Sequence, residues 1–72
     1  MNAKDYAYVK LNRAREGYAN LVKKARYDVA DADPTLVCSV MEEYLHKLDS
    51  ARNDIIRCEG MVEAFKMMEE NE

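Results

Sequence analysis

The sequence predicts an all-α protein, an antiparallel two-helix hairpin of the coiled-coil type that is completed by a partner or by dimerisation. Three observations support this fold class. Two long segments carry an apolar residue at every third or fourth position, one proline separates them, and the chain has only 72 residues. We expect a single domain over residues 1–72, with a helix at about 3–30, a turn at about 31–34 and a helix at about 35–69.

The first helix is predicted to begin after Asn2, because Asn2 followed three residues later by Asp5 is an N-cap pattern of the capping-box type. Apolar residues then recur with an unbroken four-three spacing, which is typical of the seam of an amphipathic helix. These seam positions are Ala7, Leu11, Ala14, Tyr18, Leu21 and Ala25. Gly17 interrupts this helix at a cost of about 1 kcal/mol relative to alanine.

The second helix is predicted to begin at an Asp-Pro pair, with Asp33 as the N-cap and Pro34 in the first turn. The same spacing then continues over nine apolar positions. They are Val37, Met41, Tyr44, Leu48, Ala51, Ile55, Cys58, Val62 and Phe65. Reflection about the turn pairs Ala25 with Met41, Tyr18 with Leu48, Ala14 with Ala51 and Leu11 with Ile55.

Charge also differs between the two helices. Residues 1–32 carry seven basic and four acidic side chains, whereas residues 33–72 carry four basic and ten acidic ones. A basic helix beside an acidic one favours the pairing, although each exposed ion pair contributes only a few tenths of a kcal/mol.

Apolar residues outside the seam are the functional signal. Leu45, Ile56 and Met67 are eleven residues apart and predict a second stripe on the second helix. On the first helix, Tyr8, Val22 and Val29 lie beside the seam. The second helix is longer than the first, and we expect its last two turns to project beyond the end of the first helix. Because exposed apolar patches of this extent mark interfaces, we predict a partner-binding surface. Its residues are Leu45, Ile56, Met61, Phe65, Met67 and Met68, with Tyr8 and Val22 secondary.

No enzyme is predicted, and no catalytic residue, cofactor or metal site. Cys38 and Cys58 lie 20 residues apart on one helix, too far for a disulfide. We expect Cys58 in the core and Cys38 partly buried. His46 is a solitary histidine among acids, and a metal site would need further ligands.

The expected location is the cytoplasm, because no apolar run is long enough to span a membrane, no basic-then-apolar leader opens the sequence, and unpaired thiols suit a reducing compartment. The basic residues of the first helix could suit a small nucleic-acid-binding hairpin. The net charge of −3 opposes this reading.

The chain resembles the small E-component co-chaperones of type III secretion systems over about residues 18–66. The resemblance rests on Lys24-Ala25-Arg26-Tyr27-Asp28, the short polar turn, Leu48-Asp49-Ser50-Ala51 and Ile55-Ile56. It implies a two-helix hairpin that joins a helical-repeat chaperone and keeps the secretion-needle subunit unpolymerised. The Asp33-Pro34 turn also resembles the needle subunits themselves, but the polar C-terminal tail departs from their pattern.

Two functions therefore stand ahead of the nucleic-acid-binding hairpin, which stays open as the least favoured of three. The first is a protein-binding co-chaperone or adaptor that completes its core with a heterologous helical chaperone or secretion subunit. The alternative is a homodimeric four-helix bundle with a structural or regulatory role.

Overall fold

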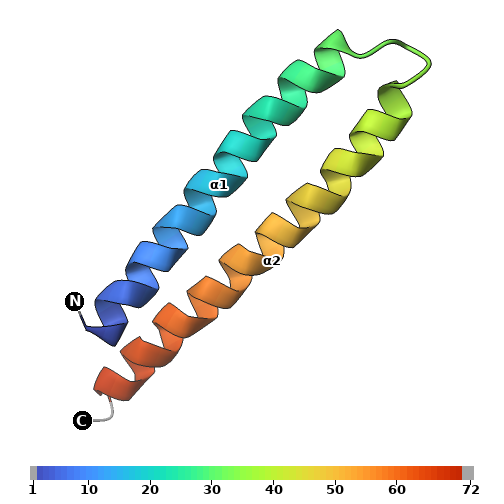
Figure 1. Cartoon of the computed structure of the whole chain (residues 1–72). Helices are drawn as coiled ribbons and strands as arrows, with labels where there is room; N and C mark the ends of the chain where they lie inside the picture. The colour runs from blue at the N-terminus through green and yellow to red at the C-terminus, as the bar shows by residue number, and fades with distance from the viewer. Residues whose placement is uncertain (1, 71–72) are drawn as a thin grey trace.

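The computed structural model describes residues 2–70 and contains two helices, α1 (Ala3–Asp31) and α2 (Val37–Glu70), which lie side by side and antiparallel (Figure 1). The prediction of an all-α helical hairpin is confirmed. Its Cα atoms extend over 58 × 18 × 12 Å, so the molecule is one layer of two helices. Each helix has one helical neighbour and turns its remaining sides outward.

The cap of α1 forms at the predicted residue. The Asn2 side chain accepts a hydrogen bond from the backbone N–H of Asp5 at 2.9 Å, and the Asn2 carbonyl accepts one from Tyr6 N–H at 3.0 Å. The first bond satisfies one of the N–H groups that every helix start leaves without an intrahelical partner, and the second is the first hydrogen bond of the helix itself.

The turn is also organised by an aspartate. The Asp33 carboxylate accepts hydrogen bonds from Thr35 N at 3.0 Å and Thr35 Oγ1 at 2.9 Å, and both bonds lower the pKa of Asp33. The Asp33 carbonyl accepts a further bond from Leu36 N–H at 2.8 Å. Residues 34–36 thus form a separate turn, and α2 begins at Val37, two residues later than expected.

The best-packed part of the interface lies towards the open end of the hairpin. Ala7, Leu11 and Val62 form a buried cluster there, and five half-buried residues pack against it. They are Tyr8, Ile55, Cys58, Met61 and Phe65. Tyr44 is the other buried residue among residues 2–70 and lies nearer the turn.

Every predicted seam residue is buried or half-buried except Met41, which is 47% exposed. Val40 is half-buried in its place. The spacing from Val37 to Tyr44 therefore runs three-four near the turn instead of four-three, and the buried side of α2 is shifted by one residue there.

The predicted pairing is wrong by one heptad. Ala25 shares a groove with Leu48, and Ala14 shares one with Cys58, each seven residues beyond the partner obtained by reflection. Side chains of a helix lean towards its own N-terminus. In an antiparallel pair this lean makes α1 residues meet α2 residues that lie farther from the turn. The later start of α2 adds to the same displacement.

The predicted overhang is also wrong. Lys4 of the first turn of α1 forms an ion pair with Glu69 at 2.7 Å, and this contact raises the pKa of Lys4. Phe65 packs against the core cluster that contains Ala7 and Leu11. The last two turns of α2 therefore lie beside α1.

Candidate protein-binding surface

The hairpin has two broad faces, one on each side of the interhelical seam. Residues seven apart stay on one side of a helix, so each face can be named from a column of α1. The valine face carries Tyr8, Arg15, Val22 and Val29, which line grooves between the helices. The lysine face carries Lys10 and Lys24, which line the grooves on the opposite side.

The half of the valine face next to the turn is a groove of apolar side chains. Five of its six lining residues are apolar, and Arg26 at the edge is the exception. The apolar members are Val22, Ala25, Val29, Ala30 and Leu48. Leu45 belongs to the same side of α2, since it precedes the groove residue Glu59 by two heptads. Leu45 is 61% exposed, so the groove continues into an uncovered apolar rim.

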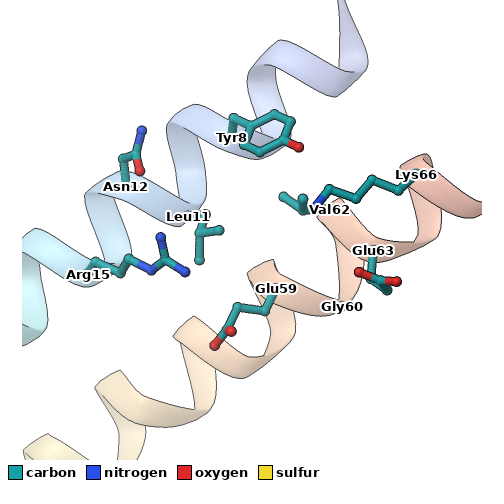
Figure 2. Close-up of a pocket in the computed structure, with 9 residues that line it drawn as sticks. All are labelled: Tyr8, Leu11, Asn12, Arg15, Glu59, Gly60, Val62, Glu63 and Lys66. Carbon is teal, nitrogen blue, oxygen red and sulfur yellow. The ribbon is translucent and has the colours of Figure 1, made fainter.

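The other half of the valine face is charged. Figure 2 shows Arg15 and Asn12 projecting from α1 and Glu59, Glu63 and Lys66 from α2, around the buried Leu11 and Val62. Basic charge therefore stands on the α1 wall of this groove, and net acidic charge stands on the α2 wall. The valine face thus changes from apolar at the turn to polar at the open end.

The lysine face beside the turn mixes charged side chains with the apolar Leu36 and Val40. Its groove is lined by Lys24, Asp28, Asp31, Glu43 and Lys47, among others. Tyr44 also lines this groove. The Tyr44 hydroxyl donates a hydrogen bond to the Asp28 carboxylate, and Lys47 Nζ lies 5.2 Å from the centre of the Tyr44 ring. The hydrogen bond, then burial and the neighbouring negative charge, raises the pKa of Tyr44 to about 12.

The predicted partner-binding residues divide between these surfaces. Leu45, Ile56, Met67 and Met68 are each more than half exposed, whereas Tyr8, Met61 and Phe65 are half-buried against the core cluster. Val22 lines the turn-side groove. Met61 and Met68 belong to the lysine-face column of α2, so the eight predicted residues do not form a single patch.

Other candidate groups are dispersed. Cys58 packs against the core as expected, but Cys38 is exposed and the prediction that it is partly buried is wrong. Cys38 follows Val37 on α2 and falls in the same outward column as Leu45. Within residues 2–70, no three histidine, cysteine or carboxylate side chains gather as a metal site would require.

The solvent-accessible surface of the chain is 5,805 Å². A compact monomer of 8.3 kDa would expose ~4,600 Å², so the hairpin exposes an additional ~1,200 Å². Exposed large apolar side chains are spread over both helices and the turn. They are Tyr6, Tyr27, Leu36, Met41, Leu45, Ile56, Met67 and Met68.

Comparison of the chain with protein-family models, curated proteins and solved structures finds no match. Among residues 2–70, neither helix has the combination of length and apolar character that crossing a membrane requires.

Sequence reasoning did not identify the charged half of the valine face. The sequence did contain an indication of it, because Arg15 lies at the same heptad position as Tyr8, Val22 and Val29. The opposing Glu59 could be placed there only with the correct helix register. The bond between Tyr44 and Asp28 was missed for the same reason.

Proposed function

We propose that this protein is a non-enzymatic binding module that completes its helical core with another protein. The excess surface of ~1,200 Å² carries the proposal, because one side of a standard protein–protein interface buries ~800 Å². A partner helix packed on the hairpin would cover apolar groups that α1 and α2 cannot cover for each other.

The distribution of exposed apolar groups supports a helical partner. Leu45, Ile56 and Met67 recur at intervals of eleven residues along α2, which is close to three helical turns. A stripe of this kind runs parallel to the helix axis and matches the apolar side of an amphipathic helix. Flexible methionine side chains adapt to the groove of such a partner.

The specific form of the proposal is a co-chaperone or adaptor. The resemblance to the E-component co-chaperones suggests a helical chaperone as the partner and a secretion-needle subunit as the protein kept soluble.

Substitution of the stripe tests the proposal. The tagged chain carrying Ile56→Asp and Met67→Asp is compared with the unchanged chain in pull-downs from the native cell, with the captured proteins identified by mass spectrometry. Both residues are more than half exposed, so we expect helicity to persist while the partner is lost. Tyr27→Asp is the matched control, because Tyr27 is 71% exposed and lies outside the stripe. Equal recovery of the partner by all three chains would refute the proposal.

A further inference from the structure

We propose that the valine face pairs with a second copy of this chain to form a four-helix bundle. The two copies are related by a two-fold axis parallel to the long axis of the hairpin. This inference goes beyond the proposed function, since a heterologous partner is not needed for it. The excess surface of ~1,200 Å² suits one partner, so a second copy competes with the heterologous partner for it, and either proposal can fail alone.

The uneven polarity of the valine face selects the direction of this axis. The half beside the turn is lined by Val22, Ala25, Val29 and Leu48, and the other half carries Arg15 and Glu59. An axis parallel to the hairpin keeps both turns at the same end, so that apolar surface meets apolar surface. A perpendicular axis that reversed one hairpin would place the apolar groove against charged side chains, at a desolvation cost.

The charges on the two walls of the face fit the same arrangement. Rotation about the parallel axis places α1 of each copy over α2 of the other, so all neighbouring helices in the bundle are antiparallel. The α1 wall contributes Arg15 and Arg26 and no acid, while the α2 wall contributes Glu59, Glu63 and Lys66. Arg15 and Arg26 of α1 therefore lie over the α2 side that holds Glu59 and Glu63, twice in the dimer, and Arg52 and Lys66 are the basic exceptions on that side.

The register within one hairpin sets the register between copies, because this axis leaves the height of each residue unchanged. Arg15 and Glu59 line one groove and hence lie at one level, so Arg15 of each copy is brought near Glu59 of the other. Val29 and Leu45 lie two heptads closer to the turn than Arg15 and Glu59, respectively, and meet in the same way. The face is thus complementary to itself at the Arg15–Glu59 and Val29–Leu45 levels, and Val22 meets the stem of Arg52 between them.

The available area suits one such contact. The hairpin exposes ~1,200 Å² more than a compact monomer, against ~800 Å² that one partner buries in a standard interface. The lysine face is a poorer choice, since the part beside the turn would bury Lys24, Asp28, Asp31, Glu43 and Lys47.

Sedimentation equilibrium of the purified chain, over low micromolar to millimolar concentration, tests the pairing. We expect a dimer of about twice 8.3 kDa, and we expect Val29→Asp to raise its dissociation constant at least about tenfold. Met68→Asp is the control, because it places the same charge on the lysine-face side and should leave the dimer intact. A monomer at every concentration overturns the inference, as does a dimer that is sensitive to Met68→Asp and insensitive to Val29→Asp.

Two charge-reversal variants, Arg15→Glu and Glu59→Arg, test the pairing independently if Val29→Asp fails to fold. Arg15→Glu alone and Glu59→Arg alone each place like charges together, both within a chain and between copies. Mixing the two variants restores opposite charges only between copies. We therefore expect the mixture to associate about tenfold more tightly than either variant alone. Equal association of the mixture and the single variants overturns the assigned register.

The two proposals fail separately. A monomeric chain that still captures a partner through Ile56 and Met67 contradicts self-pairing and preserves the proposed function. A stable dimer that captures no other protein supports self-pairing and contradicts the proposed function.

Discussion

Truncation of Leu11 to alanine should remove most of the stability of the hairpin. Leu11 is 5% exposed and belongs to the buried cluster with Ala7 and Val62. Truncation of a buried leucine costs about 2–5 kcal/mol, which combines the lost transfer free energy with the cavity left behind. A chain of 72 residues has a total stability of about 4–11 kcal/mol, and the large exposed surface places this hairpin near the lower end.

Leu36→Ala is the matched control, because it removes the same atoms from a leucine that is 57% exposed. We expect it to cost about 1 kcal/mol or less, in proportion to the smaller buried area. Urea unfolding followed by circular dichroism, with all three chains at one concentration, measures both changes. Equal losses for Leu11→Ala and Leu36→Ala would show that the buried cluster does not hold the helices together, and the packing argument would be refuted.

Three further changes are predicted. Gly17→Ala should stabilise the hairpin by about 0.5–1 kcal/mol, because a Cβ atom there meets no other group within 4 Å and glycine is a poor helix former; an unchanged urea midpoint would contradict this. Asn2→Ala should cost about 1 kcal/mol through loss of the cap to Asp5 N–H, seen as a lower melting temperature than that of the unchanged chain. Tyr44→Phe should alter the alkaline pH dependence of unfolding. The bond to Asp28 raises the pKa of Tyr44 from 10.0 to about 12, so its stabilising contribution is complete below pH 10 and is lost as the pH rises to 12. The urea midpoint of the unchanged chain should therefore fall more steeply between pH 10 and 12 than that of Tyr44→Phe, and parallel profiles would argue against this bond.

The fold could be predicted from local information. The three- and four-residue spacing of apolar side chains and the Asn2 cap are properties of short segments, and both helices form as these signals indicate. The start of α2 could not be predicted from these local signals alone, because it depends on one further contact in the turn. Asp33 engages Thr35 and Leu36 before the helix proper begins, which delays α2 to Val37.

The relative position of the helices could not be read from spacing alone. A heptad pattern fits equally well after a shift of seven residues, because every seam residue then meets another seam residue. The lean of the side chains selects the register that joins Ala25 with Leu48 and Lys4 with Glu69. The exposure of Met41 and the burial of Val40 depend on the same packing.

The candidate surface could also be predicted only in part. The excess of apolar residues over one seam was visible in the sequence, and Leu45, Ile56 and Met67 are indeed uncovered. The partition into a valine face and a lysine face needed both helices in register, because each groove is built from α1 and α2 together.

We propose that the uncovered apolar side chains of α2 are the surface on which another protein packs. Oxidation of Met67 by dilute peroxide, followed by mass spectrometry, tests it directly, because Met67 is 56% exposed and its thioether is accessible in the isolated chain. We expect rapid oxidation in the purified chain and oxidation at least about tenfold slower in the complex isolated from the native cell. Equal rates in the two samples would contradict it.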